Sequence, residues 1–478
     1  MKELENCKPE LFFKWFEKIC QIPHPSFHEE KLCDFLVTFA ADRRLEYVRD
    51  TMNNLLIRVP TSEGYEDVPS FLLQSHIDMV PVVDEGVVFD FLTDPIQLRV
   101  VGNELRATGT TLGMDNGGGV AAMLAFADDP TIKHPELELL FTVQEEVGMG
   151  GVQNFDFRQI KSRRMINFDS GRTHSLCVSS AGSITHLVQQ QLPTEKAEGD
   201  VVKIVVRDGL GGHAGLDIHK NRACAANVMG ELLHLLGKQM SVRIALVKAW
   251  NTGIFPRCDA EIVVPSGSYT RAKRVLETAF AALNQRYVLT DPNLCCKIEN
   301  IGNCTQALSD TDSTRVKNLL FLFRTALRKC DADNPSIVLG SGSVMKADLT
   351  DGYLDFAYAV RAVDDNVRDL YGEVTEQLLR LLGFEWKIGK RYGGWPMQHG
   401  SNIVALFDRK HEEVFGYTPG HRFVHGGIEV GYIVSAIPEM DAIAVNLPMA
   451  NAHTTNELLY LDQVPDFWAL LTAVLAEK

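Results

Sequence analysis

The sequence lacks three features that would mark particular classes of protein. Its 478 residues contain no uncharged apolar run long enough to cross a bilayer, so no membrane span is expected. The amino terminus lacks the continuous apolar stretch of a secretory signal. The ten cysteines show no CxxC spacing, and the adjacent Cys295 and Cys296 are poorly placed for an ordinary structural disulfide. We therefore expect a cytoplasmic protein with reduced thiols.

Basic side chains are also in deficit. The chain has 47 Lys and Arg against 62 Asp and Glu, which gives a formal net charge of -15. A polyanion would be repelled by this charge, so we do not expect a nucleic-acid partner. With 45% hydrophobic and 23% charged residues, the composition is that of a globular protein, and the length predicts two or more domains.

Short apolar runs alternate with helical stretches from about residue 10 to 180, which predicts an α/β domain with a mainly parallel sheet. Four runs carry the argument: FLLQSHIDMV, LELLFTVQEE, RMINFDS and, later, MDAIAVNLP. Each ends at, or within a few residues of, a His, Asp or Glu. Because open α/β sheets bind ligands outside the carboxyl ends of their strands, we expect these polar residues to converge on one edge.

The middle of the chain repeats a pattern of strands and helices. Strand-like SVRIALVKAW and CDAEIVV with helical RAKRVLETAFAALNQ are echoed by SIVLGSGSVM, LDFAYAVRAV and VRDLYGEVTEQLLRLLG. This repeat predicts an inserted α+β domain made of two ferredoxin-like βαββαβ units. We therefore predict one domain at residues 1–184 and 393–478, and an inserted domain at residues 185–392.

Two short motifs contain candidate ligands. His76 and Asp78 form an HxD pair at a strand end, where alternation places both side chains on the same side of the chain. That arrangement suits a metal-binding imidazole with a carboxylate behind it, although such pairs also serve as caps or surface groups. Asp115 follows a glycine-rich turn in TGTTLGMDNGGG, which has neither GxGxxG nor GxxxxGK[ST] spacing. The turn therefore favours a carboxylate ligand over a phosphate loop, with a simple strand-to-helix connection as the structural alternative.

Acidic residues follow two of the other strands. Glu145 and Glu146 end LELLFTVQEE, and since neighbouring strand side chains point in different directions, one can hold metal while the other faces substrate. Two such carboxylates repel each other unless cations lie beside them, and a solvated acidic loop is the alternative. Asp169 ends RMINFDS, and His453 lies in NLPMANAHTTNE.

Two imidazoles and three carboxylates together form a donor set that suits zinc in a catalytic site. This set comprises His76, Asp115, Glu146, Asp169 and His453.

These motifs resemble a known family. SHIDMV, GTTLGMDNGGG, LFTVQEEVGMGG, NFDS, GLGGHAGLDIHKNRACAAN and HGGIEVG are similar, in order and separation, to those of the metallopeptidase family that includes cytosolic dipeptidases, aminoacylases and glutamate carboxypeptidases. The resemblance spans nearly the whole chain and is strongest to the aminoacyl-histidine dipeptidase branch. It implies hydrolysis of unblocked dipeptides, with histidine at the carboxyl side, by two Zn²⁺ per chain. Mn or Co can substitute for zinc in carboxylate-rich sites.

The resemblance also implies how the metals are held. Asp115 would bridge the two zinc ions, with His76 and Asp169 completing one site and Glu146 and His453 completing the other. A hydroxide shared by the two metals would then attack the peptide carbonyl.

Further roles follow from the resemblance for side chains that hold no metal. Glu145 matches the general base, and Asp78 matches the residue that orients the first ligand histidine. His213 in GGHAG matches a histidine that reaches the active site of the other subunit, so the resemblance implies a homodimer whose inserted domain serves as lid and dimerisation domain. Asn251 and Arg361 match substrate-contacting positions, and an arginine suits a bidentate grip on a free carboxylate.

The sequence departs from the family at two places. HTTNE stands where relatives commonly have serine and proline after the last metal histidine, and GLGGHAG has alanine where serine is usual. Both changes affect the shape of the substrate pocket rather than the ligands. Asp169, where acylamino hydrolases of the family tend to have glutamate, favours a peptidase. Acylamino acids or tripeptides are the alternative substrates, and a non-catalytic metal-binding module is the alternative of another class.

Overall fold

The computed structural model describes residues 4, 7–172, 174–250 and 253–478. The chain divides into two compact units. Unit 1 comprises Met1–Ser179, Trp395–Phe423 and Ile428–Lys478, and unit 2 comprises Ser180–Gly394 and Val424–Gly427. Unit 2 is thus inserted into unit 1. The chain returns briefly to unit 2 at residues 424–427, a segment that the sequence analysis placed in the first domain.

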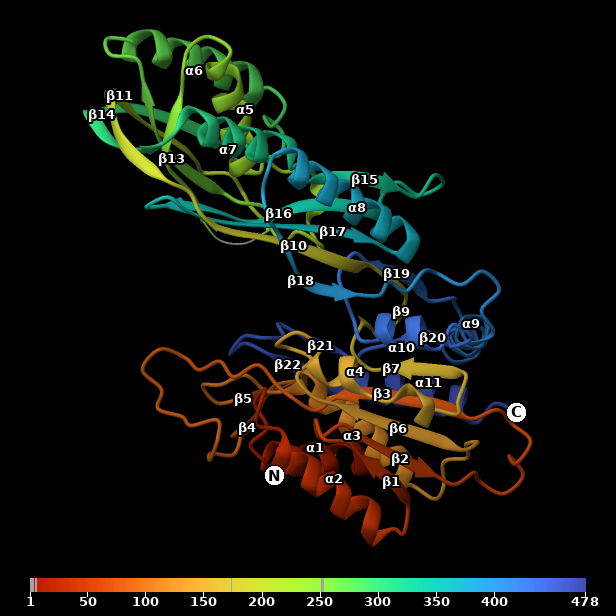
Figure 1. Ribbon diagram of the computed structural model, residues 1–478. Helices are drawn as coiled ribbons and strands as arrows, with labels where there is room; N and C mark the ends of the chain where they lie inside the picture. The colour runs from red at the N-terminus through yellow and green to blue at the C-terminus, as the bar shows by residue number, and fades with distance from the viewer. Residues whose placement is uncertain (1–3, 5–6, 173, 251–252) are drawn as a thin grey trace. The chain divides into compact units, whose positions relative to one another are not determined.

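Unit 1 is built on a nine-stranded sheet (Figure 1). Its strands are β1 (Glu46–Arg49), β2 (Leu55–Val59), β3 (Phe71–His76), β6 (Leu137–Thr142), β7 (Arg164–Asn167), β8 (Gly171–Arg172), β9 (Ser175–Ser180), β19 (Gly420–Val424) and β20 (Asp441–Ala444). The order is β1-β2-β6-β3-β7-β20-β9-β19, with β8 paired to β9. The central strands β6, β3, β7 and β20 are parallel, and β1–β2, β2–β6 and β20–β9 are antiparallel. The predicted α/β class is confirmed, with the parallel strands at the centre of a mixed sheet.

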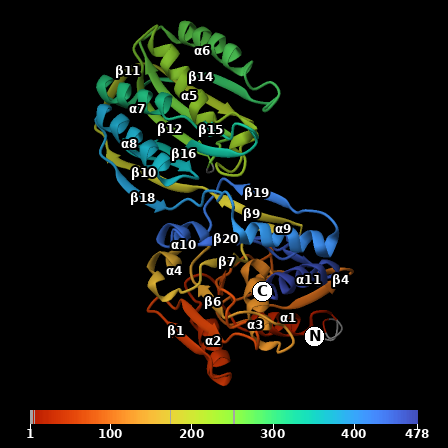
Figure 2. The same ribbon diagram turned by 90° about the vertical axis from the view of Figure 1, so that its right-hand side faces the viewer.

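Helices cover both faces of this sheet (Figures 1 and 2). One face packs against α1 (Glu10–Cys20), α2 (Glu30–Asp42), α3 (Met114–Asp128), α9 (Asn402–Phe415) and α11 (Val464–Leu475), which share one hydrophobic core with alternate strand residues. The other face is covered by α4 (Gly150–Asn154) and α10 (Val430–Ala436). Every residue of β3 and β6 is buried. Burial on both faces explains why apolar residues do not alternate with exposed polar ones in these strands.

A small second sheet supports the loop that carries His453. Its strands are β4 (Leu98–Val101), β5 (Glu104–Ala107), β21 (Met449–Ala450) and β22 (Leu458–Tyr460), in the order β21-β22-β5-β4. Because β21 and β22 pair with Ala450 opposite Leu458, residues 451–457 form the loop of a hairpin.

Unit 2 contains a second nine-stranded sheet. Its elements are β10 (Gly182–Gln191), β11 (Thr194–Arg207), α5 (Ala225–Gly237), β12 (Arg243–Trp250), β13 (Arg257–Val264), α6 (Tyr269–Asn284), β14 (Cys295–Leu308), α7 (Asp310–Leu322), β15 (Ala326–Cys330), β16 (Val338–Thr350), β17 (Tyr353–Ala362), α8 (Asp365–Leu381) and β18 (Lys387–Tyr392). The strand order is β14-β11-β13-β12-β16-β17-β10-β18, with β15 paired to β16.

This order contains two ferredoxin-like halves, as the sequence predicted. In the first half, β11-α5-β12-β13-α6-β14 follow one another along the chain and pair in the order β14-β11-β13-β12. In the second half, the strands pair in the order β16-β17-β10-β18. The second half is discontinuous, because the whole first half lies between β10 and α7.

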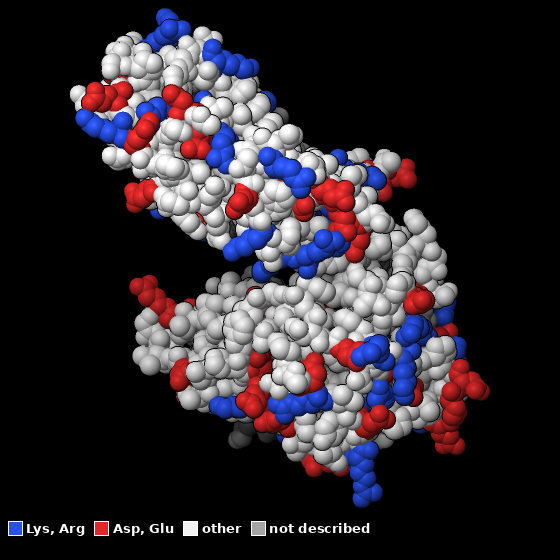
Figure 3. All heavy atoms as spheres, in the orientation of Figure 1, with Lys and Arg blue, Asp and Glu red and all other residues white. Residues whose placement is uncertain are grey.

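Two further features are the hydropathy of the helices and the distribution of surface charge. None of the helices in the described part of the chain is long and apolar enough to cross a membrane. On the face seen in Figure 3, Lys and Arg side chains are interspersed with Asp and Glu. The excess of acidic residues is therefore spread among cations on this face rather than gathered in one area.

Candidate metal-binding and catalytic site

Six residues that the sequence analysis proposed as ligands or base lie in unit 1, close to where its parallel strands end. They are His76 at the end of β3, Asp115 at the start of α3, Glu145 and Glu146 after β6, Asp169 after β7, and His453 in the hairpin loop between β21 and β22. The structure brings these side chains together from segments up to several hundred residues apart.

His76 points one ring nitrogen toward two carboxylates. Its Nε2 lies 3.2 Å from Oδ1 of Asp115 and 3.7 Å from Oδ1 of Asp169. Its Nδ1 lies 3.0 Å from the backbone carbonyl oxygen of Asp78. If Nδ1 carries the proton and donates it to that carbonyl, the Nε2 lone pair is free to bind a cation between the carboxylates.

His453 approaches Asp115 from the other side of its carboxyl group. The Nε2 of His453 lies 3.4 Å from Oδ2 of Asp115 and 2.8 Å from Oε1 of Glu146. The two oxygens of Asp115 thus face two different histidines, as a carboxylate that bridges two cations would require.

Two groups of donors in this cluster could each hold a metal ion. One comprises His76, Glu145 and Asp169, and the other comprises His76, Asp115 and Glu146, with the ligand atoms of each group within 4.8 Å of one another. The first group includes Glu145, for which the sequence analysis proposed the role of base rather than ligand. The geometry therefore offers a metal position without choosing between these two roles.

The charges of the cluster fit a cation. Burial and then the charge of Asp169 raise the pKa of Glu145 well above its usual range, and burial raises the pKa of Asp169 to about 6 even though His76 lowers it. Hydrogen bonds to Asp115 and Glu146 raise the pKa of His453 to about 10. Burial alone would lower the pKa of His76, but its carboxylate neighbours raise it well above the usual value. Four carboxylates with two imidazoles thus compete for protons that bound cations would replace.

The turn that carries Glu145 and Glu146 is held by its backbone. Asp78, which is buried, accepts hydrogen bonds from the amide of Glu145 (2.9 Å) and the amide of Glu146 (3.3 Å). The buried carboxyl of Glu29 accepts one from the amide of Gln144 (3.1 Å). Three consecutive N–H groups are therefore fixed by carboxylates from other segments.

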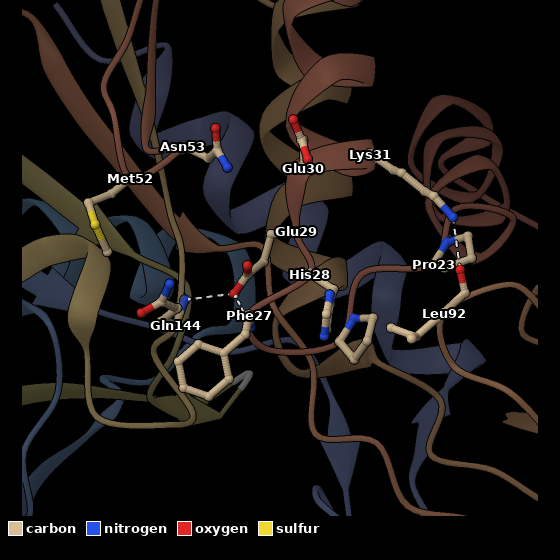
Figure 4. Close-up of a pocket in the computed structure, with 11 residues that line it drawn as sticks. Pro23, Phe27, His28, Glu29, Glu30, Lys31, Met52, Asn53, Leu92 and Gln144 are labelled. Carbon is tan, nitrogen blue, oxygen red and sulfur yellow. Dashed lines mark hydrogen bonds between the residues drawn. The ribbon is translucent and has the colours of Figure 1, made fainter.

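A pocket of about 280 Å³ lies beside this turn (Figure 4). In it the Glu29 carboxyl bonds to the amides of both Phe27 and Gln144, as the dashed lines show. Its described lining includes none of the six cluster residues. The pocket therefore lies next to the candidate site without forming part of it.

Unit 2 brings two of the predicted substrate-binding residues near each other. Arg361 is buried, and its Nε and Nη1 have no hydrogen-bond partner among the residues that the structure describes. Its charge contributes, after burial, to lowering the pKa of His213. The Nδ1 of His213 accepts the amides of Gly215 (3.2 Å) and Leu216 (3.0 Å), which leaves its proton on Nε2. Asn251 lies outside the described residues.

Sequence analysis did not single out several buried polar residues around these sites. In unit 2, His425 lies 2.7 Å through Nε2 from the Ser341 hydroxyl, and burial followed by the charge of Arg361 lowers its pKa to about 3. In unit 1, Glu429 accepts hydrogen bonds from Gln74 (2.6 Å) and Thr142 (2.7 Å).

His425 and Glu429 lie within the motif HGGIEVG, and a third such residue, Glu457, ends the motif HTTNE. The sequence analysis quoted both motifs. Only their place in those motifs could have identified them.

A mixed α/β domain that gathers acidic and histidine side chains at the ends of parallel strands fits the class of metal-dependent hydrolases. The chain belongs to peptidase family M20/M25/M40, whose sequence model matches residues 72–477. The predicted family and enzyme class, a metallopeptidase, are thereby confirmed.

Individual relatives match along the whole chain. The cytosol non-specific dipeptidase of Escherichia coli K12 is 29% identical over 488 aligned positions, which cover 100% of this chain and 99% of the relative. The crystal structure of aminoacylhistidine dipeptidase from Vibrio alginolyticus superimposes with a TM-score of 0.91 at 26% identity, covering 99% of both chains. Aminopeptidase PepT from Bacillus cereus shares the fold, with a TM-score of 0.56 at 15% identity over 98% of both chains.

Proposed function

We propose that this chain is a dipeptidase that hydrolyses unblocked dipeptides, including those with histidine at the carboxyl side, with two Zn²⁺ per chain. The observation that carries the proposal is the position of Asp115, whose two oxygens face His76 and His453. Full-length similarity to a dipeptidase and to an aminoacylhistidine dipeptidase supports the substrate class.

Both metal positions draw on the same carboxylate. His76, Asp115 and Asp169 would hold one ion, and Asp115, Glu146 and His453 would hold the other. When bound, such ions lower the pKa of water and polarise the scissile carbonyl.

The chain's own residues would move the proton. Glu145 accepts a proton from the attacking water and then donates it to the leaving amine, so the carboxyl ends the cycle as it began. Burial, the largest cause of its raised pKa, supports the first of these transfers, because a buried carboxylate accepts a proton from water more readily than one of ordinary pKa. Asp78 keeps Glu145 in place through the bond to its backbone amide.

We assign substrate recognition to unit 2. The Nε and Nη1 of Arg361, which have no hydrogen-bond partner in the described part of the chain, suit the free carboxylate of a dipeptide, and the Nε2–H of His213 suits a carbonyl oxygen. Asn251 would contact the same substrate. We further propose a cytoplasmic homodimer in which unit 2 serves as lid and dimerisation domain and His213 acts in the partner's site.

The test combines a variant with a substrate panel. Glu145→Ala should lose turnover by at least about 100-fold, the usual contribution of a general base, while its zinc content stays near that of the parent. The panel comprises Ala-His, β-Ala-His, Ala-Ala, N-acetyl-Ala and Ala-Ala-Ala. We expect two zinc ions per parent chain and turnover of the free dipeptides. Retained turnover in Glu145→Ala would refute the base, and cleavage of only N-acetyl-Ala or the tripeptide would refute the substrate class.

A further inference from the structure

The carboxyl group of Glu457 is buried against the backbone of the turn that carries Asp115. Its Oε2 accepts hydrogen bonds from the amides of Leu112 (2.8 Å) and Gly113 (2.9 Å), and its Oε1 accepts one from the amide of Asp115 (3.0 Å). Only 2% of the residue is exposed. One carboxylate thus binds three backbone N–H groups that water does not reach freely.

These N–H groups belong to a turn that has no cap of its own. The amino-terminal cap of α3 is Gly113, which has a left-handed φ of 69° and no side chain that could accept a hydrogen bond. Asp115 itself departs from helical geometry, with φ -85° and ψ 100°. Since the first N–H groups of a helix have no partner within the helix, Glu457 supplies from a distant segment what a Ser or Asp cap normally supplies.

Glu457 and His453 lie on the same short hairpin loop. Within this loop, the Thr454 hydroxyl donates to the Asn451 carbonyl oxygen (2.8 Å), the Asn456 amide to the Thr454 hydroxyl (3.2 Å), and the Glu457 amide to the Thr454 carbonyl oxygen (3.1 Å). These bonds make the loop a compact body. It therefore carries His453 and Glu457 at a fixed separation.

The loop consequently meets the Asp115 turn at two points. Glu457 binds the backbone of the turn, and His453 Nε2 lies 3.4 Å from the Asp115 carboxylate. Two contacts between compact segments fix both distance and orientation, whereas the side-chain contact alone would leave the loop free to swing.

We propose that Glu457 is a positioning residue that sets the separation of Asp115 and His453, and thereby the affinity of the metal position which these two share with Glu146. This inference rests on the proposed two-zinc function. The position built on His76 and Asp169 depends on Glu457 only through Asp115, so it should be affected less.

The decisive variant is Glu457→Gln. A glutamine keeps one acceptor oxygen but places an NH₂ group against at least one N–H donor. It therefore cannot accept hydrogen bonds from the amides of Leu112 and Gly113 and from the amide of Asp115 at the same time. Burial raises the pKa of Glu457 to about 7, so assays at about pH 8 keep the parent carboxyl ionised. We expect one of the two zinc ions to bind at least about tenfold more weakly, measured by competition with a chromophoric chelator. Glu457→Asp retains both oxygens and should restore part of this affinity.

Glu138 offers a matched control in the same unit. It is fully buried on β6 and accepts the amides of Lys161 (2.9 Å) and Ser162 (2.8 Å). It lies near the amino end of its strand, whereas the candidate ligands follow the carboxyl ends. Glu138→Gln should lower the Tm of the metal-free protein without lowering the affinity for either zinc ion.

The outcomes separate the inference from the proposed function. Selective loss of one zinc ion in Glu457→Gln, with both retained in Glu138→Gln, supports the positioning role. Two zinc ions of parental affinity in Glu457→Gln, or equal weakening in both variants, would overturn it while leaving the proposed function intact. A parent that binds fewer than two zinc ions would refute the proposed function, and the inference with it. If Glu457→Gln fails to fold, Glu457→Asp serves as the test, because its side chain is shorter. If Glu457→Asp binds both zinc ions with parental affinity, the positioning role is overturned.

Discussion

Replacing Asp78 with Asn should slow the enzyme without removing any proposed ligand or base. Oδ1 of Asp78 accepts the Glu145 amide at 2.9 Å, and Oδ2 accepts the Glu146 amide at 3.3 Å and the Ser26 hydroxyl at 2.8 Å. An asparagine has only one acceptor oxygen. Because the Ser26 hydroxyl can turn round to accept from the new NH₂ group, the favoured orientation keeps the bond to Glu145 and leaves the Glu146 amide without an acceptor.

The magnitude follows from these bonds. A partly buried N–H left without a partner costs about 1–3 kcal/mol, and loss of the charge weakens each remaining bond by about 1 kcal/mol. If about 3 kcal/mol of this total appears in the transition state, kcat/KM falls about 100-fold. We expect most of this fall to appear in kcat rather than in KM, since Asp78 is buried behind the turn and acts on its backbone.

The assay is steady-state hydrolysis of Ala-His and Ala-Ala, with zinc content and Tm measured on the same preparations. Asp441→Asn is the control, because Asp441 also accepts a serine hydroxyl and a backbone amide, those of Ser401 and Ile403, at the amino end of β20. It should lower Tm and leave kcat near the parental value. A kcat/KM of Asp78→Asn within threefold of the parent, or an equal loss in Asp441→Asn, would refute the reasoning.

Three further predictions concern pH, metal binding and packing. Burial raises the pKa of Glu429 to about 7 from an ordinary 4.5, so its contribution to stability is full below pH 4.5 and is lost as pH rises to 7. Over this range the free energy of unfolding of metal-free Glu429→Gln, measured in urea, should therefore fall by about 3 kcal/mol less than that of the metal-free parent. His453, with its pKa raised to about 10, is protonated in the metal-free chain at neutral pH, so zinc binding should release about one proton fewer in His453→Ala, measured by calorimetry in buffers of different ionisation enthalpy. A Cβ at Gly119 would lie 2.6 Å from the Cβ of Phe168, so Gly119→Ala should cost about 1–3 kcal/mol in denaturant unfolding, whereas Gly117→Ala, with its nearest contact at 3.5 Å, should not.

Much of the fold could be predicted because it is written in local patterns. The apolar runs ending at His76 and Asp169 became the buried parallel strands β3 and β7, and the repeated segments of the middle section became β12-β13-α6 and β16-β17-α8. The discontinuity of unit 2 could not be predicted. Residue patterns identify a strand but do not say that β10 pairs with β17 and β18, beyond an entire intervening half.

The candidate site shows the same division. Ligand types and their positions after strands predicted which side chains gather, and the structure brings His76, Asp115, Asp169, Glu146 and His453 into contact. Their roles as ligands stay a prediction. Sequence could not distinguish Glu145 as base from Glu145 as ligand, because a difference of a few ångströms in the turn after β6 decides between them and no local pattern encodes it.

The backbone bonds by which carboxylates hold the ligand-bearing turns could not be predicted, even for Asp78, which the sequence analysis proposed as the residue that orients His76. Glu29, Asp78 and Glu457 act on backbone amides, and every residue except proline has such an amide, so the bonded partner leaves no signature in the chain. Each of these carboxylates also adds negative charge around donors that already repel one another. The same carboxylates that hold the turns therefore add to the mutual repulsion of the cluster, and cation binding offsets that repulsion. Rigid placement and affinity for cations thus have a common origin in this site.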